Sequence, residues 1–238
     1  MTKGLILAAV AMSLIVAMRY LLSSGFFAWL TTKRKPKHHR GLQTQIQREI
    51  KWSLASAVIY GVPAGLTFWT WRHLGWTQMY IDTLDYPIWY VPISIMMYLV
   101  AHDTWFYWTH RAMHSKQLFN LAHSVHHQSK PPTAWAAMSF HPFEAVVGAI
   151  FIPIMAFLVP IHLGALVIVL TVMTIMGVTN HMGWEIFPKW FVHSALGKWL
   201  ITASHHERHH EQYKGNYGLY FRFWDKICGT DHGLSNNL

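Results

Sequence analysis

The chain has 238 residues, of which 53% are hydrophobic and only 12% are charged, and its formal net charge is +9 at neutral pH. A charged fraction about half that of ordinary domains argues against a soluble globular protein. The basic excess has no aromatic-interleaved pattern or nucleic-acid-binding motif, so no nucleic-acid partner is expected. A single cysteine, Cys228, excludes an internal disulfide and a cysteine-based metal knuckle.

Five apolar runs organise the chain, at residues 5–22, 52–71, 87–108, 145–160 and 161–180. Because about twenty apolar residues cross a bilayer as a helix, the first three runs are long enough alone, and the last two predict a hairpin that turns near Pro160. Only Lys3 precedes the first run and no clear cleavage site follows it, which does not fit a signal peptide. Residues 23–30 are expected to lie along the membrane surface, with Arg19 reaching the headgroups.

The lysines and arginines predict the orientation. Sixteen of them fall between residues 31 and 51, between 109 and 142, and after 180, whereas only Lys3 and Arg72 fall on the opposite side and Arg19 lies within the first run. The positive-inside rule then places the N-terminus outside and the C-terminus in the cytoplasm, in a bacterial inner membrane. The predicted fold class is an all-α integral membrane protein, a bundle of about four to five transmembrane helices with a cytoplasmic histidine-rich helical cap that holds a dimetal site. We expect one membrane domain over residues 1–238, with N-terminal helices and a basic loop in 1–86 and a catalytic region in 87–238.

Histidines follow the third apolar run at helical spacing. His110 and His114 are four residues apart, so on a helix both rings lie on one face, as chelation of a metal requires. Asp103 lies two turns earlier on the same stripe. Its carboxylate is expected to accept the second ring N–H of a ligand histidine and so fix the orientation of that ring.

The spacing H-x-x-H-H then occurs twice, at His123, His126 and His127 and again at His206, His209 and His210, with His205 as an alternative to His206. Chance predicts about 0.1 such triplets in a chain with this many histidines. Neutral imidazole is a good ligand for iron, zinc and copper, and these rings exceed what one metal can use, so we predict two metal ions.

A further pair, His181 and Glu185, stands at the end of the last apolar run. If the helix continues through Gly183, both side chains face the metal site. A glutamate beside an apolar span with no nearby cation needs a counter-charge when it is buried, and a metal cluster would provide one. A solvated carboxylate beyond the membrane edge is the alternative.

Imidazole ligation without thiolates suits redox iron better than structural zinc, although zinc can replace iron in a purified protein. Two irons can supply two electrons for the cleavage of O2 and attack on an unactivated C–H bond. A site at the cytoplasmic helix ends can receive a lipid or other hydrophobic substrate from the membrane.

These segments resemble the fatty acid hydroxylase superfamily, which includes sterol desaturases, sterol methyl oxidases and sphingolipid hydroxylases. The resemblance runs from about residue 102 to 230 and rests on "DTWFYWTHRAMH", "HSVHH", "FHPFE", "NHMG" and "HHERHH...NYG...FWDKICGT" in this order. It implies a non-haem diiron membrane monooxygenase or desaturase that uses O2 and an external electron donor. The ligands that it implies are His110, His114, His123, His126, His127, His181, His206, His209 and His210. Some relatives have histidine at the position of Glu185, and His141 of "FHPFE" is a ligand, a residue that supports a ligand, or a structural residue at a helix start.

The chain has no G-x-G-x-x-G fingerprint, and one cysteine cannot hold an iron–sulfur cluster. The reductase is therefore expected to be separate, with a ferredoxin or cytochrome as donor. Lys189, Lys198, Lys214, Arg222 and Lys226 offer a basic face for it, which positive-inside bias explains equally well. Two other functions remain open: a membrane protein that binds or transports metal, and a zinc-dependent membrane hydrolase. The motif expected of such a hydrolase is H-E-x-x-H, and His206-Glu207-Arg208-His209 is one residue shorter.

Overall fold

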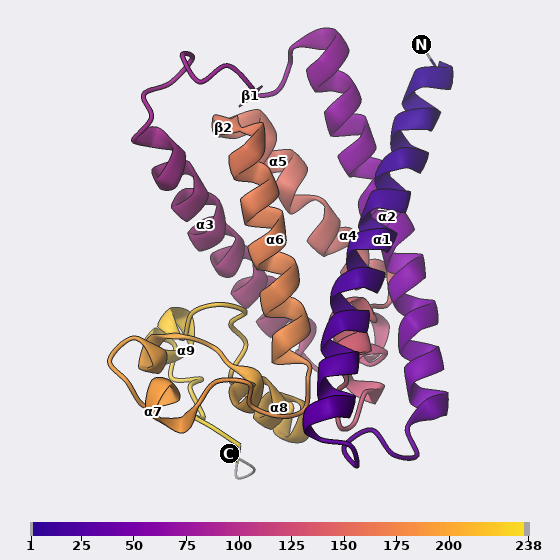
Figure 1. Ribbon diagram of the computed structural model, residues 1–238, viewed down its shortest axis with the longest axis vertical. Coiled ribbons are helices and arrows are strands. Elements are labelled where there is room, and N and C mark those ends of the chain that lie inside the picture. Colours follow the sequence, from indigo (N-terminus) through magenta and orange to yellow (C-terminus); the bar gives the residue numbers. More distant parts are fainter. Residues whose placement is uncertain (1, 236–238) are drawn as a thin grey trace.

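Long helices run roughly parallel in the computed structural model, which describes residues 2–235, and the short C-terminal helices gather at one end of them (Figure 1). The helices are α1 (Thr2–Arg34), α2 (Gln43–Leu74), α3 (Tyr90–Met113), α4 (Pro142–Ala149), α5 (Phe151–Leu158), α6 (Leu163–Asn180), α7 (Lys189–Val192), α8 (Ala203–Gln212) and α9 (Phe223–Ile227). A π-helical turn spans Phe119–His123, and 3₁₀ turns span His126–Gln128, Ala134–Met138 and Gly197–Trp199. The chain is thus mostly helical, as expected. One short exception is a parallel pair of two-residue strands, β1 (Met79–Tyr80) and β2 (Ile161–His162).

Two of the helices, α1 and α6, are long and apolar enough to cross a membrane. The fourth predicted run corresponds to a shorter apolar stretch, Pro142–Leu158, formed by α4 and α5. The runs at 52–71 and 87–108 fall within α2 and largely within α3. Each apolar run of the sequence is therefore helical for most of its length.

The first helix departs from the expectation for residues 23–30. These residues do not form a separate surface segment, because α1 continues through them to Arg34. Ser24 and Thr31 are buried, and the Trp184 indole N–H donates to Thr31 Oγ1 at 3.0 Å. The prediction of a separate surface segment is wrong because α1 is continuous here and packs one face against the chain around the end of α6, while Phe26 and Trp29 on its other side remain exposed.

Small residues let α1 and α2 approach closely. Gly61 and Gly65 lie one turn apart on α2, and a Cβ at either position would collide with the α1 backbone at Ser13 or Ala9. Helices in a membrane gain little from burying apolar surface against each other, so close backbone packing at such small-residue pairs contributes much of their association. Gly75, in the left-handed conformation at φ 63°, ends α2.

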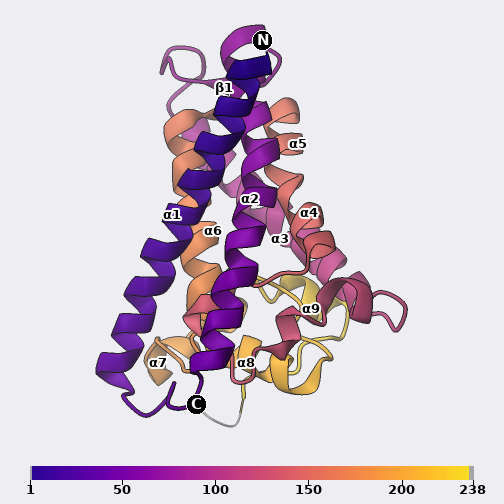
Figure 2. The same cartoon turned by 90° about the vertical axis from the view of Figure 1, so that its right-hand side faces the viewer.

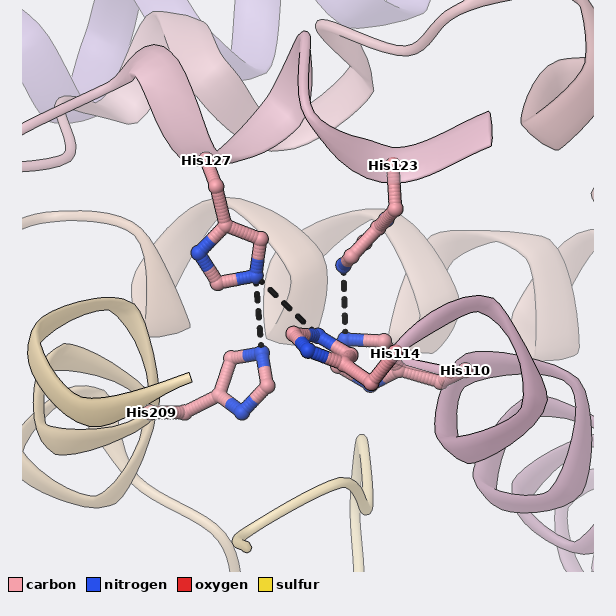
Figure 3. Close-up of side chains that lie close together, drawn as sticks. All are labelled: His110, His114, His123, His127 and His209. Atoms are coloured by element: carbon pink, nitrogen blue, oxygen red, sulfur yellow. Dashed lines mark hydrogen bonds between the residues drawn. The ribbon is translucent and has the colours of Figure 1, made fainter. Parts of the chain in front are cut away.

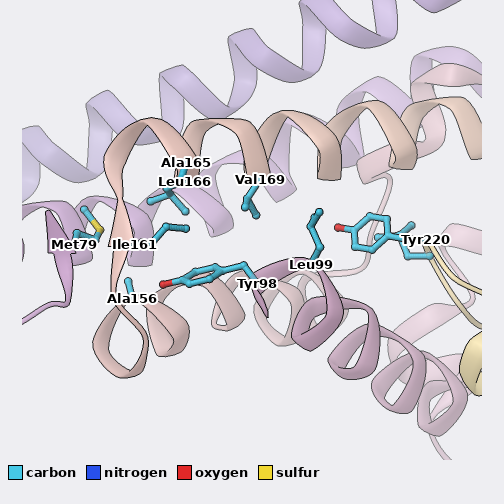
Figure 4. Packing of buried hydrophobic residues seen from close by; sticks show 10 residues of the cluster. Met79, Tyr98, Leu99, Ala156, Ile161, Ala165, Leu166, Val169 and Tyr220 are labelled. Atoms are coloured by element: carbon cyan, nitrogen blue, oxygen red, sulfur yellow. The ribbon is translucent and has the colours of Figure 1, made fainter. Parts of the chain in front are cut away.

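A second packing region joins α3, α5, α6 and the segment before α9 (Figure 4). Tyr98 and Val169 are fully buried in it, and the Tyr98 hydroxyl donates to the Val159 carbonyl at 2.9 Å. Leu219 and Tyr220 of the C-terminal segment belong to the same cluster. This packing fixes the C-terminal segment against the lower ends of α3 and α6.

The end where α3 and α6 finish also holds α7, α8 and α9, and both views agree on this arrangement (Figures 1 and 2). α3 ends at Met113 and α6 at Asn180, so the histidines that follow or close these helices lie beside α8. We call this end, residues 110–141 together with residues 181–235, the cap.

Candidate metal centre

Nine buried or half-buried histidines meet in two groups inside the cap. We call them the first histidine group (His110, His114, His123, His127 and His209) and the second histidine group (His126, His181, His206 and His210). Within each group, the possible ligand nitrogens all lie within 4.8 Å of one another. The structure thus brings together all nine histidines that the sequence singled out. The groups are adjacent, since the His127 and His210 ring centroids are 4.5 Å apart.

The H-x-x-H-H triplets explain how two groups form from few elements. In the turns that carry the first triplet, His123 and His127 face the first group, and His126 faces the second. α8 reverses this order: His209 faces the first group, while the residues three before and one after it face the second. Side chains at i and i+4 stack on one helical face, and the i+3 side chain lies at its edge. Each triplet therefore gives two rings to one group and one ring to the other.

The Nε2 atoms of the first group point inward (Figure 3). His110 Nε2 lies 2.9 Å from His123 Nε2, and His127 Nε2 lies 3.2 Å and 3.1 Å from those of His114 and His209. Two nitrogens bound at about 2.1 Å and at right angles to one metal are about 3 Å apart. These distances match the edges of a coordination polyhedron.

The second histidine group has the same spacing. His181 Nε2 lies 3.0 Å from His126 Nε2 and 2.9 Å from His206 Nε2, and His210 Nε2 lies 3.2 Å from His206 Nε2. The second group thus forms one chain of near contacts between Nε2 atoms, whereas the first forms a pair and a trio.

The partners of the Nδ1 atoms indicate which ring nitrogens carry a proton. Nδ1 of His110 faces the Tyr217 carbonyl at 2.9 Å, and Nδ1 of His123 faces Glu144 Oε1 at 2.8 Å. The Tyr217 carbonyl only accepts hydrogen bonds, so Nδ1 of His110 carries the proton, and in a neutral ring Nε2 is then an unprotonated acceptor. This lone pair points toward Nε2 of His123, 2.9 Å away, as it would if both rings bound one metal. The arrangement therefore fits a metal ion bound to Nε2.

Two more rings are oriented in the same way, since His209 Nδ1 faces the Gly215 carbonyl at 2.8 Å and His181 Nδ1 faces the Gly177 carbonyl at 2.6 Å. Such contacts behind a ligand histidine fix its tautomer and direction.

Burial keeps the rings of the two histidine groups neutral. Loss of hydration lowers the pKa of His114 to about 2, with the charge of His110 adding to the effect. Burial, followed by the charges of neighbouring histidines, also holds the pKa values of His209 and His210 well below their ordinary range. Metal binding requires neutral imidazole, so both groups are ready to bind metal at neutral pH.

Glu144 is the functional contact that the sequence reasoning missed. It lies in α4, is 6% exposed, and holds His123 through the 2.8 Å contact. "FHPFE" includes this glutamate, and it precedes an apolar run with no cation nearby in sequence. The signal that drew attention to Glu185 was therefore present at Glu144 as well.

Asp103 has partners other than those expected. Its Oδ1 accepts backbone N–H groups from Leu219, Tyr220 and Phe221, at 3.2, 2.7 and 3.3 Å. No described histidine contacts this oxygen, and Nδ1 of His110 has the Tyr217 carbonyl instead. The prediction that this carboxylate orients a ligand ring directly is wrong. Asp103 holds the backbone segment that orients it.

Glu185 also has a different place. α6 ends at Asn180, and Gly183 has φ +69°, so the helix does not continue to bring Glu185 beside His181. The carboxylate accepts from the Phe187 N–H at 3.1 Å and from the Ser204 N–H, in the first turn of α8, at 3.2 Å. Neither histidine group includes it.

Two open alternatives are settled by geometry. His205 Nδ1 contacts Thr202, with its backbone N at 3.2 Å and Oγ1 at 3.1 Å, whereas His206 belongs to the second histidine group. His141 precedes α4, and its Nδ1 accepts from the Phe143 N–H at 3.3 Å. His141 is therefore a residue of the helix start.

The comparisons with known proteins agree with this centre. The family model described as fatty acid hydroxylase matches residues 95–230, more than half of the chain. The chain belongs to the fatty acid hydroxylase family. All nine histidines of the two groups lie inside the matched region.

Several relatives that this chain is similar to are named as sterol enzymes. The chain is 28% identical over 212 residues to the Delta(7)-sterol 5(6)-desaturase ERG3B of Gibberella zeae, over 89% of this chain and 64% of the relative. It is 28% identical over 196 residues to lathosterol oxidase of Rattus norvegicus, over 82% of this chain and 64% of the relative. It is 33% identical over 150 residues to methylsterol monooxygenase erg25B of Aspergillus fumigatus, over 61% of this chain and 50% of the relative. The chain thus spans between half and two thirds of the length of these relatives. No solved structure matches it.

Proposed function

We propose that this fatty acid hydroxylase is a non-haem diiron membrane enzyme that hydroxylates or desaturates a C–H bond of a lipid, with a sterol, acyl chain or carotenoid-like molecule as substrate. The observation that carries the proposal is that both histidine groups reach an apolar cavity between the helices. His123 of the first group and His126 and His181 of the second line this cavity, whose volume is about 130 Å³.

The cavity suits a hydrocarbon substrate. Its other walls include Trp105, Phe106, Met113, Met173 and Val178, which come from α3 and α6. Apolar walls next to the metal ligands exclude water and leave room for part of a lipid. This volume is close to that of an apolar cavity that holds a benzene-sized group.

The nine histidines would hold two irons, which when bound supply the activation of O2 and the removal of hydrogen from carbon. The donor set favours iron over structural zinc because it contains no thiolate. The chain itself contributes neutral rings with fixed tautomers and a dry cavity that positions the substrate. Glu144 Oε1 lies 2.8 Å from Nδ1 of His123, while the carbonyls of Tyr217, Gly215 and Gly177 accept the ring N–H groups of three other histidines.

Exposed apolar residues on several long helices support a membrane bundle of four to five spans. Val58, Val62 and Leu66 are exposed on α2, as are Met96 and Val100 on α3, so apolar side chains face outward on helices besides α1 and α6. Apolar surface of this extent suits lipid contact. The positive-inside rule supports a cap in the cytoplasm and an N-terminus outside a bacterial inner membrane.

A cysteine at position 83 should react with an impermeant label in intact cells, while one at position 130 should not. The reverse pattern would contradict this topology.

A separate electron donor, a ferredoxin or cytochrome with its reductase, would dock on the cap. Lys189, Lys198, Lys214 and Lys226 are exposed there and form its basic face. Arg222 differs from them because it is paired with Asp231 at 2.7 Å.

The two alternative functions have less support. His206 and His209 belong to different histidine groups, so they do not form the single site that a zinc hydrolase needs. A metal transporter would want ionisable residues along its spans, and here the histidine groups gather in the cap.

The test compares the lipids of cells that express the protein with those of cells that express a His126→Ala variant. Mass spectrometry should find a lipid that gains one oxygen or loses two hydrogens only with the intact protein. Metal analysis after iron-supplemented expression should give two ions per chain. Unchanged lipids in several lipid backgrounds, together with one ion or none per chain, would contradict the proposal.

A further inference from the structure

The apolar cavity beside the histidine groups is too small for a whole lipid. Its volume of about 130 Å³ suits a group of about the size of benzene, so the rest of a lipid substrate must lie outside it. A passage between the cavity and the membrane is therefore needed.

Two sides of the cavity carry polar groups. Ligand histidines and Glu144 line it at the cap end, and Arg19, Tyr20 and Tyr60 line it on the side of α1 and α2. Arg19 thus lies inside the bundle, and its expected position at the headgroups is wrong. A charged side chain in a membrane span faces polar groups or water rather than hydrocarbon. A hydrocarbon chain therefore leaves the cavity more readily through an apolar wall elsewhere.

The side of α3 has such a wall, and Figure 1 shows α3 on the other side of α6 from α1 and α2. An outer groove on this helix is lined by Ala101, Trp108 and Phe151 among other residues, and Trp108 is 46% exposed. Trp105 and Thr109 line both this groove and the cavity. These two side chains therefore form part of the wall between the cavity and the membrane.

A second groove continues the first along α3. Ala101 belongs to both, and the second groove runs between α3 and α5 as far as Pro92. The helix from Pro92 to Thr109 is about 25 Å long, close to the bilayer hydrocarbon thickness of about 30 Å. The described walls of both grooves contain no charged side chain. We call the two grooves together the α3 groove, and its length and walls suit an extended hydrocarbon chain.

Trp105 closes the wall in this structure. Its indole N–H donates to the Val147 carbonyl of α4 at 3.1 Å. The Thr109 hydroxyl donates to the Trp105 carbonyl at 2.7 Å, which leaves its methyl group for contact with a chain. α4 ends at Ala149, where the helix is interrupted because Pro153 of α5 has no N–H for the Ala149 carbonyl. A hydrogen bond that one side chain can release thus joins α3 to α4 beside a helix break.

We propose that the substrate enters from the membrane between α3 and α4, past Trp105 and Thr109, and that its hydrocarbon tail stays in the α3 groove while the reacting part occupies the cavity. The inference rests on the proposed function, which it deepens by naming the route and by requiring a substrate with an apolar part longer than the cavity. Bulk lipid would cover the α3 groove without reaching the cavity, so the two occupants can be told apart.

The test maps where a lipid chain binds in the purified, iron-loaded protein, held in phosphatidylcholine nanodiscs without an electron donor. The probes are stearic acid and cholesterol that each carry a diazirine, and mass spectrometry locates the cross-links. At least one probe should label both the α3 groove and cavity walls such as Met173. An excess of the unlabelled compound should suppress both labels, because one chain spans the two places.

Three variants test the route. Ala101→Trp fills the point where the two grooves meet and should reduce both labels about fivefold or more, because forcing a bulky ring into occupied space is unfavourable. Val62→Trp places the same ring on the exposed face of α2, should leave both labels unchanged, and is the matched control. Trp105→Phe removes the hydrogen bond to Val147 and should speed the appearance of the cavity label after mixing by about fivefold, the factor that one hydrogen bond supplies. Misfolding cannot imitate a faster specific label.

Labels on the α3 groove that the excess compound does not suppress would show bulk lipid contact only and overturn the inference. Suppressible labels in the cavity without any in the α3 groove would overturn it as well, because the chain would then enter elsewhere. Labels that persist in Ala101→Trp, or no suppressible label from either probe, would have the same meaning. Since the mapping needs no turnover, suppressible labels in both places without any oxidised lipid in cells would leave the route standing and count against the proposed function.

Discussion

Replacing Asp103 with asparagine tests whether its carboxylate only supports the fold or also acts in the reaction. Asp103 is 2% exposed, and its Oδ1 accepts three backbone N–H groups of residues 219–221. An asparagine side-chain oxygen can accept the same three hydrogen bonds, so the substitution removes the charge but keeps the acceptor.

The magnitude follows from the geometry. Only the contact with the Tyr220 N–H, at 2.7 Å, is short. A hydrogen bond to a charged acceptor is worth about 1.5–3 kcal/mol and one to a neutral acceptor about 1 kcal/mol, so Asp103→Asn should cost about 1 kcal/mol. Asp103→Ala leaves the three N–H groups without their acceptor and should cost about 3 kcal/mol. In a chain of this size, 1 kcal/mol lowers the melting temperature by about 2–4 °C.

Asp225→Asn is the matched control. Asp225 Oδ1 and Oδ2 accept the N–H groups of Tyr217 and Gly218, both at 2.9 Å, so an amide must turn a donor toward one of them. It should therefore lose more stability than Asp103→Asn, by about 1–2 kcal/mol. Thermal unfolding, metal content and lipid oxidation are measured on all three variants. An Asp103→Asn protein with normal stability and metal content but no activity would refute the reasoning, because its carboxylate would then act in the chemistry.

Three further predictions concern other contacts. Glu185→Ala removes an acceptor at the start of α8 and should cost about 1 kcal/mol of unfolding free energy, while elemental analysis still finds two metal ions; loss of one ion per chain would make Glu185 a ligand again. Gly61→Ala should lower the thermal stability by about 1–3 kcal/mol, because its Cβ meets the backbone of Ser13, and an unchanged melting temperature would show that the two helices can separate at little cost. Burial, and then the charge of His38, lowers the pKa of His39 from its ordinary 6.5 to about 4. The folded protein therefore binds fewer protons than the unfolded chain between these values, and its stability should fall as the pH drops from about 6.5 to 4, by about 1 kcal/mol for a partly exposed ring. His39→Gln should flatten this dependence in unfolding curves, and an equally steep dependence would assign it to other groups.

The sequence predicted most of the metal centre because ligand spacing is a local property. His110 and His114, or His206 and His210, must share a face on any helix, so their grouping needed no knowledge of the fold. The group to which the remaining ring of each triplet belongs, His126 or His209, could not be predicted, because that depends on where the two groups lie in the fold. The sequence also predicted the helical class, since long apolar runs leave few alternatives.

The errors all involve contacts between distant segments. Glu144 and Glu185 carry the same local signal, a carboxylate beside an apolar run. Which of them contacts a histidine depends on where α6 stops and how α4 packs. Asp103 was placed correctly on the stripe of His110, but the C-terminal segment 219–221 reaches its carboxylate first. Arg19 could be recognised as unusual, whereas its direction toward the cavity depends on the rotation of α1 in the bundle.

The division of each histidine triplet between the two groups has a consequence for assembly. α8 contributes to both groups, as do the turns that carry His123, His126 and His127. The docking of α8 therefore completes both groups at once. The two groups depend on it unequally, because without α8 the first group keeps four of its five histidines, whereas the second keeps only His126 and His181.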